Sequence, residues 1–175
     1  MKMKKMIVMF IGICLLALLL CGCDGGRRYR TDLTSWDVME EILDEMPHDG
    51  AEYRLVGDDF ISASSFGEGY RELLSSSLDW SVVVSRNADT NVSEIGVFRV
   101  REDIDMEGVL ATVSSYVDAQ KLRLPPLLEM YNPDELPRVE NARVERFGQY
   151  VVYTILNENE LSAVRQGVVD ALTDD

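Results

Sequence analysis

All three cysteines of the chain lie at or before position 23, and this decides how the remainder can be held together. With no later cysteine, residues 24–175 cannot form a disulfide among themselves, even if the chain is exported to a compartment where disulfides form. Their fold has to be held by an apolar core. A stretch of about 150 residues is one ordinary domain and is long enough to bury such a core.

The cysteines follow a lysine-rich start and an uncharged apolar segment, Met6–Leu20. This order is typical of a secretory signal peptide, and roughly 15 apolar residues are fewer than the ~20 that a membrane-spanning helix needs. Leu20, Gly22 and Cys23 match the box of lipoprotein precursors, in which a small residue precedes a cysteine that receives diacylglycerol. The sequence therefore predicts cleavage between Gly22 and Cys23 and lipid attachment at Cys23.

Two alternatives stay open for this start. Cys21 fits the box less well, because Leu20 would stand where a small residue is needed. An uncleaved apolar segment would act as a membrane anchor and leave the same domain outside. In the favoured case the diacylglycerol supplies two acyl chains, which is enough for stable attachment. We expect a protein that is lipid-anchored in the cell membrane and faces the extracytoplasmic side.

We expect three segments: a lipoprotein signal peptide over 1–22, the lipidated cysteine and a tether over 23–33, and a single domain over 34–172. Fully extended, the ten or so residues after Cys23 would span about 35 Å, which keeps the domain near the membrane. Arg27, Arg28 and Arg30 in this tether either rest on anionic headgroups or are ordinary polar residues of a solvated linker.

Acidic side chains dominate the charge of the chain. There are 17 Lys and Arg against 31 Asp and Glu, and the loss of Lys2, Lys4 and Lys5 with the signal peptide would change the net charge from −14 to −17. Such a charge repels nucleic acid and anionic polymers. We expect no nucleic-acid partner, and a cationic protein is the partner that the composition favours.

Helical spacing of apolar residues recurs three times. It predicts amphipathic helices over 34–46, over 103–123 and from Asn159 to Leu172, with Thr34 or Ser35 as the cap of the first. Pro125 and Pro126 end the long middle helix, and a short helix over 126–131 and a loop over 132–137 follow.

Alternating spacing predicts two β-hairpins, over 80–100 and over 139–156, the second with its turn at Gly148. Helices and hairpins therefore alternate along the chain. This order favours an α+β fold: a single small domain with an antiparallel sheet of two hairpins and helices packed on one face. Residues 51–79 are less regular, with Tyr53–Val56 as a short strand or turn and 67–77 as a short helix.

Several of these segments together resemble a known family. They are the cysteine box, the first helix, Trp80-Ser-Val-Val-Val, Glu94-Ile-Gly-Val-Phe-Arg-Val, the long helix, Leu136-Pro-Arg-Val-Glu-Asn-Ala-Arg-Val, Gly148-Gln-Tyr-Val-Val-Tyr and the final helix. Over residues 34–172 the chain is similar to the Gram-positive bacterial lipoproteins of the domain of unknown function 4358 family. The resemblance implies location and domain type. That family has no established activity, so the resemblance assigns no functional residue.

Catalytic groups are sparse. His48 is the only histidine, so a Ser-His-Asp arrangement or a histidine metal site would have to use it, yet it lies in a Pro-His-Asp-Gly turn. With 31 carboxylates, some pair will reach the separation that glycosidases use, but the sequence favours none. We expect no catalytic residue, no metal site and no cofactor, and an unrecognised hydrolase ranks behind non-enzymatic functions.

Three other patterns are weak. Asn87, Asp89 and Asn91 are spaced as in a calcium loop, but Val92 and Phe98 stand where that loop needs glycine and glutamate, so we interpret the segment as a hairpin turn. Gly67-Glu-Gly69 lacks the third glycine of a dinucleotide fingerprint. Aromatic residues can stack on sugars; Trp36 and Trp80 lie on apolar faces, which favours core packing, and Tyr131 is the better surface candidate.

The leading hypothesis is a non-enzymatic lipoprotein that acts by protein–protein contact, as an accessory or assembly factor. The alternative is a domain at the cell surface that binds or senses a small ligand. A deep apolar pocket with a few convergent polar groups would favour the alternative, and a shallow surface with an exposed apolar patch would favour the leading hypothesis. The sequence leaves the oligomeric state open.

Overall fold

The computed structural model describes residues 28–47, 52–86 and 91–173. Five strands form one antiparallel sheet with the spatial order β1-β2-β3-β5-β4. The strands are β1 (Tyr53–Leu55), β2 (Ser77–Ser85), β3 (Glu94–Val100), β4 (Arg143–Phe147) and β5 (Tyr150–Ile155). Both predicted hairpins are confirmed, as β2–β3 and β4–β5, and they pair with each other through β3 and β5. The α+β class is therefore confirmed, with β1 as a further strand at one edge.

Seven α-helices are described. They are α2 (Ser35–Glu45), α3 (Ala63–Phe66), α4 (Tyr70–Ser76), α5 (Met106–Arg123), α6 (Pro125–Tyr131), α7 (Leu136–Glu140) and α8 (Glu158–Leu172). Short 3₁₀ turns are η1 (Asp58–Phe60), η2 (Gly67–Gly69) and η3 (Pro133–Glu135). Thr34 caps α2 as predicted, whereas α8 is capped by Asn157 rather than Asn159. In both caps the side chain accepts a backbone N–H that the first turn leaves unpaired.

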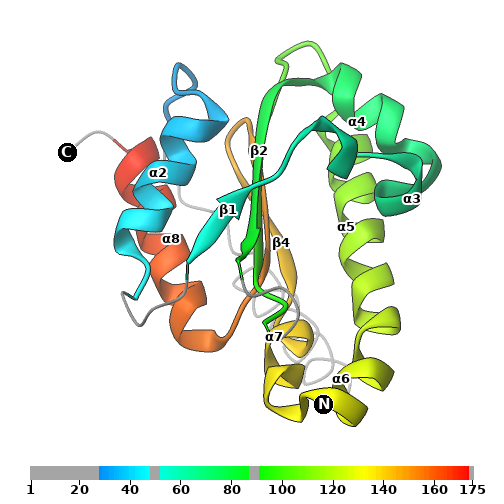
Figure 1. Cartoon of the computed structure of the whole chain (residues 1–175). Coiled ribbons are helices and arrows are strands. Elements are labelled where there is room, and N and C mark those ends of the chain that lie inside the picture. The colour runs from blue at the N-terminus through cyan, green and yellow to red at the C-terminus, as the bar shows by residue number, and fades with distance from the viewer. Residues whose placement is uncertain (1–27, 48–51, 87–90, 174–175) are drawn as a thin grey trace, which may run out of the picture.

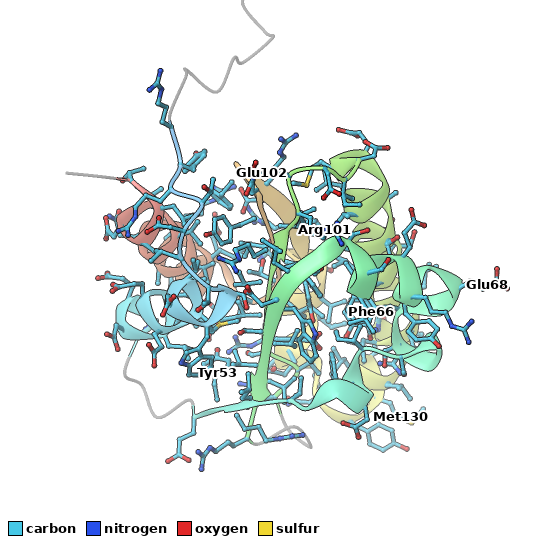
Figure 2. The ribbon with its side chains drawn as sticks, turned by 90° about the horizontal axis from the view of Figure 1, so that it is seen from above. Tyr53, Phe66, Glu68, Arg101, Glu102 and Met130 are labelled. Carbon is cyan, nitrogen blue, oxygen red and sulfur yellow. The ribbon has the colours of Figure 1, made fainter. Side chains whose placement is uncertain are left out.

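Helices cover both faces of the sheet, so the prediction of helices on one face is wrong (Figure 1). Helices α2 and α8 pack on one face, and α3 to α7 lie on the other. Figure 2 shows the same division from above, with Tyr53 on the side of α2 and with Phe66 and Glu68 on the side of α4 and α5. The physical reason lies in the central strands, since β5 is buried at every position and β3 at nearly every one. Strands without a polar face need a cover on both sides.

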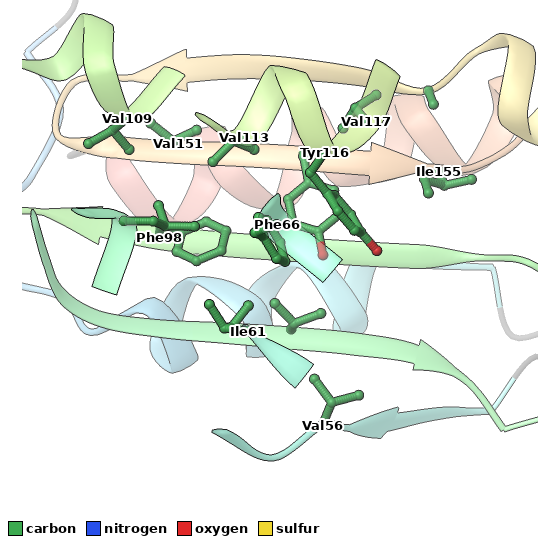
Figure 3. Close-up of a cluster of buried hydrophobic side chains, with 14 of the residues drawn as sticks. Val56, Ile61, Phe66, Phe98, Val109, Val113, Tyr116, Val117, Val151 and Ile155 are labelled. Carbon is green, nitrogen blue, oxygen red and sulfur yellow. The ribbon is translucent and has the colours of Figure 1, made fainter. Parts of the chain in front are cut away.

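The core beneath α5 is aromatic (Figure 3). Phe66 stacks on Tyr116 with ring centroids 4.1 Å apart, and the edges of both rings meet Tyr153 on β5. Gly96 on β3 makes room for this cluster, because a Cβ at that position would lie 2.0 Å from the ring of Tyr153. The glycine is therefore a requirement of packing and not of backbone conformation.

The second core lies between the sheet and the helix pair α2 and α8. These two helices approach closely at Gly167, where a Cβ would lie 2.7 Å from the Cα of Ile42. Val38, Met39, Ile42 and Val168 are fully buried in this layer. The absence of a side chain at Gly167 thus sets the distance between the two helices.

Residues 29–33 are attached to the domain instead of forming the second half of a loose tether. The Tyr29 ring meets Phe147 edge-on with centroids 5.9 Å apart, and the Arg30 N–H donates to the Leu172 carbonyl at 2.8 Å. The Leu33 carbonyl accepts from the Tyr150 hydroxyl at 2.7 Å. Cys23, the signal segment and Arg27 lie outside the described residues.

The segment after α5 also differs from the sequence prediction. Residues 132–137 were expected as a loop and Val139 as the start of a strand, but the chain forms η3 and α7 there. Arg138 on α7 pairs with Glu135 of η3 at 3.1 Å and with Glu160 of α8, and these contacts join α7 to both elements.

None of the helices in the described part of the chain is long and apolar enough to cross a membrane.

Candidate functional site

The outer edge of β2 is paired along only part of its length. Strand β1 pairs with Val83–Ser85, and one further bond runs from the Val56 N–H to the Val82 carbonyl at 3.0 Å. Ser85 donates to Ser93 on the β3 side, so the alternation of an antiparallel ladder turns the backbone groups of Val82 and Trp80 outward. Among the described residues, the outward N–H and carbonyl of Trp80 have no backbone partner.

An open groove of about 420 Å³ lies along this unpaired edge. Large apolar side chains from α2, β1, α4 and β2 line it, and we call this set the edge groove: Trp36, Leu55, Leu74, Leu78 and Trp80. Leu55 and Leu78 are each 55% exposed, and Trp36 and Leu74 are each 37% exposed. The prediction that Trp36 packs in the core is therefore wrong, whereas Trp80 is half-buried against the core beneath α5 and also lines the groove.

Polar contacts hold α2 against the side of this groove. The Ser35 N–H donates to Asp79 Oδ1 at 2.6 Å, and the hydroxyls of Ser35 and Ser81 lie 3.0 Å apart. Asp79 also pairs with Arg99 on β3 at 2.7 Å. These contacts link the first turn of α2 to β2 and β3. They therefore hold Trp36, which lies in that turn, beside the edge of β2.

A second candidate site surrounds Glu94, the first residue of β3. This side chain is 9% exposed, and its Oε1 accepts hydrogen bonds from the hydroxyls of Tyr116, at 2.7 Å, and Tyr153. Burial raises the pKa of Glu94, although both phenol hydrogen bonds and the charge of Arg123 act to lower it. Burial and the neighbouring carboxylate likewise raise the pKa of both phenols.

Glu94 lines an open pocket of about 250 Å³ between the end of α5 and the sheet. We call it the Glu94 pocket, and the residues that characterise it are Arg54, Phe60, Glu94, Gln120, Arg123 and Leu124. Arg123 donates from Nη2 to Gln120 Oε1 at 2.6 Å, which orients its guanidinium. Acceptor and donor groups thus share a small and partly apolar space.

Of the sequence-based candidates, the two tryptophans line the edge groove and Asn91 lines the Glu94 pocket. Tyr131 is 78% exposed on α6, as predicted for a surface residue. Asn91 Oδ1 accepts from the Ser93 N–H at 2.7 Å, a local turn contact, and Gly67–Gly69 forms η2 with Gly67 at φ 65°. His48, Asn87 and Asp89 lie outside the described residues, and within those residues no three His, Cys, Asp or Glu side chains gather as metal ligands would.

Both sites were missed at the level of sequence for physical reasons. Glu94 follows the polar segment between the two strands of the first hairpin, where an acid is normally solvated. The phenol groups that donate to it come from α5 and β5, 22 and 59 positions away along the chain. A local sequence pattern does not predict contacts over such separations. The edge groove depends on how short β1 is, and residues 51–79 gave no regular pattern from which that length could be judged.

The comparisons with known proteins bear on part of the fold. A family model described as a domain of unknown function (DUF4358) matches residues 69–156. The match extends from η2 to the end of β5 and includes β2, Glu94 and α5, whereas α2, β1 and α8 lie outside it. Neither a curated protein nor a solved structure matches the chain.

Proposed function

The chain belongs to the DUF4358 family, and we propose that it is a lipoprotein, anchored outside the cytoplasm through diacylglycerol on Cys23, that binds a partner protein at the edge groove. The observation that carries this proposal is the unpaired edge of β2 beside exposed apolar side chains. The chain then acts as a non-enzymatic accessory factor. Its lipid holds it at the membrane, and the groove selects the partner.

The edge of β2 favours a partner segment in extended conformation. An unpaired strand edge is a row of backbone donors and acceptors, and an added strand satisfies them while alternate side chains enter adjoining pockets. Trp80 supplies the outward backbone groups, and Leu55 and Leu78 supply apolar contact on either side. The groove is thus suited to a strand with apolar residues at every second position.

Charge favours a cationic partner over a second copy of this chain. After residue 22 the chain carries 31 acidic against 14 basic side chains, because three of the 17 basic residues precede that point. Two such chains repel each other, whereas a basic partner is attracted to the chain. We therefore propose a basic extracytoplasmic protein with an exposed extended segment.

Lipid attachment is tested by metabolic labelling with a palmitate analogue in cells that express the full chain. We expect labelling of the wild type and of Cys21→Ala, and no labelling of Cys23→Ala, because the thiol of Cys23 is the acceptor. Labelling that persists in Cys23→Ala would exclude this cysteine as the lipid site. Labelling lost only in Cys21→Ala would move the site to Cys21.

Partner binding is tested by placing a photo-cross-linking residue at position 78 in the membrane-anchored protein. Position 127 on α6 is the matched control, since Leu127 is 52% exposed and Leu78 55%, and Leu127 is not in the groove. We expect a discrete adduct from position 78 that becomes weaker in high salt, and none from position 127. Protection of the Trp80 amide from hydrogen exchange in the purified complex would establish strand addition. Equal adducts from both positions, or an unprotected Trp80 amide, would contradict the proposal.

A further inference from the structure

Of the two carboxylate oxygens of Glu94, one accepts hydrogen bonds from described residues of the protein. Removing a carboxylate from water is costly unless its oxygens are paired. Among the described residues, the hydrogen bonds to this side chain come from Tyr116 and Tyr153, and both end on Oε1. Because Glu94 lines the pocket, Oε2 is left for a donor that enters from solvent.

Donor groups of the protein line the same pocket. Arg123 lies close enough for its charge to lower the pKa of Glu94, and its Nη2 is held on Gln120 Oε1 at 2.6 Å. Gln120 is 6% exposed, and with Oε1 occupied it presents its amide N–H groups. Arg54 adds a second guanidinium from β1. An anionic group in the pocket would therefore meet several donors.

Apolar side chains make up most of the remaining lining, beside the polar residues Asn91 and Ser93, and the space is small. Phe60 contributes from η1, Leu124 from the end of α5 and Ile155 from the end of β5. The volume of about 250 Å³ lies below the roughly 300–1,000 Å³ of pockets for drug-sized ligands. These dimensions suit a ligand with a short apolar body.

We propose that the Glu94 pocket binds a small apolar α-amino acid as its zwitterion. The ammonium group lies on Glu94 Oε2, and the carboxylate lies on the Arg123 guanidinium and the Gln120 amide. A simple cation would bring no negative charge to the arginines, and a simple anion would bring no positive charge to Glu94, so the site discriminates in favour of a ligand with both charges. This inference goes beyond the proposed partner binding and does not depend on it.

The first test is isothermal titration of L-leucine, L-valine and L-phenylalanine into the full chain in detergent micelles. L-Leucinamide and 4-methylpentanoate, which each lack one charge of leucine, are titrated alongside. We expect at least one of the amino acids to bind, and each leucine analogue to bind at least tenfold more weakly than leucine, the size expected for a lost charge-assisted hydrogen bond. If none of the three amino acids binds, or if the analogues bind as well as leucine, the proposal is overturned.

The second test uses variants matched in chemistry. Glu94→Gln keeps an acceptor for the two phenols, and Arg123→Met changes an exposed residue, so both are expected to keep the far-ultraviolet circular dichroism of the wild type. We expect each to weaken amino-acid binding at least tenfold. Glu72→Gln and Arg71→Met, exposed on α4 and outside the pocket, are expected to leave it unchanged. Unchanged affinity in the folded Glu94→Gln or Arg123→Met variant would reject the assignment of that residue to the ligand.

Discussion

A carboxyl that accepts two phenol hydrogen bonds within an apolar layer couples the stability of this chain to pH. Burial raises the pKa of Glu94 above its ordinary value of 4.5, so the folded chain holds this proton more tightly than the unfolded chain does. The contribution of Glu94 to stability is therefore fully present below pH 4.5 and is lost as pH rises through the folded pKa. Tyr116, Tyr153 and Arg123 are the titratable groups that act on it.

Glu94→Gln isolates this effect, because glutamine accepts the same phenol hydrogen bonds and does not titrate. We expect the free energy of unfolding of the variant, relative to the wild type, to increase as pH rises above 4.5 and then to reach a plateau. The measurement is urea unfolding of both full chains in detergent across this pH range. The exposed acids titrate equally in both proteins and so cancel in the difference. A difference that stays constant with pH would show that the Glu94 pKa is not raised.

At the scale of elements, the separation of α2 and α8 is set by one missing side chain. We expect Gly167→Ala to lower the free energy of unfolding by about 1–3 kcal/mol, because its Cβ would meet the backbone of α2 and would force the helices apart. Gly108→Ala on α5 is the control, since its Cβ would have no neighbour nearer than 3.5 Å. We expect that variant to be neutral or about 0.5–1 kcal/mol more stable through helix propensity. Thermal unfolding of both variants distinguishes the two effects, and equal behaviour would contradict the packing argument.

The elements that could be predicted are those whose signal is local. The alternation in Trp80–Ser85, the β-branched segment Tyr150–Leu156 and the turn at Gly148 predict two hairpins. Thr34 or Ser35 predicts where α2 begins, and Thr34 is the cap. The cover on both faces was missed, although Val151, Val152 and Tyr153 are consecutive apolar residues, a pattern typical of a strand buried on two sides.

Other features depend on contacts between distant residues and have no local signal. Helix α7 forms where a loop and the start of a strand are predicted, and its Arg138 pairs with Glu160 on α8, a contact between residues 22 positions apart. The Glu94 pocket needs residues from β1, η1, β3 and α5, and the edge groove needs α2 beside a strand 40 residues later in the chain. Neither site could be assembled before the topology of the sheet was known.

At the scale of the whole molecule, three layers are joined to a short N-terminal strap, residues 29–33, that packs on the end of α8 and on the β4–β5 turn. Helix α6 lies at the opposite end of the molecule (Figure 1). The strap makes two kinds of contact, an aromatic one at Tyr29 and hydrogen bonds at Arg30 and Leu33. It is therefore part of the folded unit.

Replacing residues 29–33 with glycine and serine is expected to lower the free energy of unfolding by about 1–3 kcal/mol, because an aromatic contact and several hydrogen bonds are lost. The same replacement over residues 24–28 keeps the length of the chain and is the control. We expect the control to unfold at the temperature of the wild type. Equal stability of the two variants, measured by thermal unfolding in detergent, would show that the strap adds nothing to the fold.

The strap also limits how far the domain can travel. With a lipid on Cys23, only the stretch from Asp24 to Arg28 separates the bilayer from the attached chain, and five extended residues span at most about 18 Å. A linker of that length keeps the domain in a thin layer above the membrane. The domain then reaches a partner by lateral diffusion in two dimensions. A partner confined to the same layer meets the groove more often than one that diffuses freely in three dimensions. A weak and readily reversible contact would then be sufficient to keep the two proteins together.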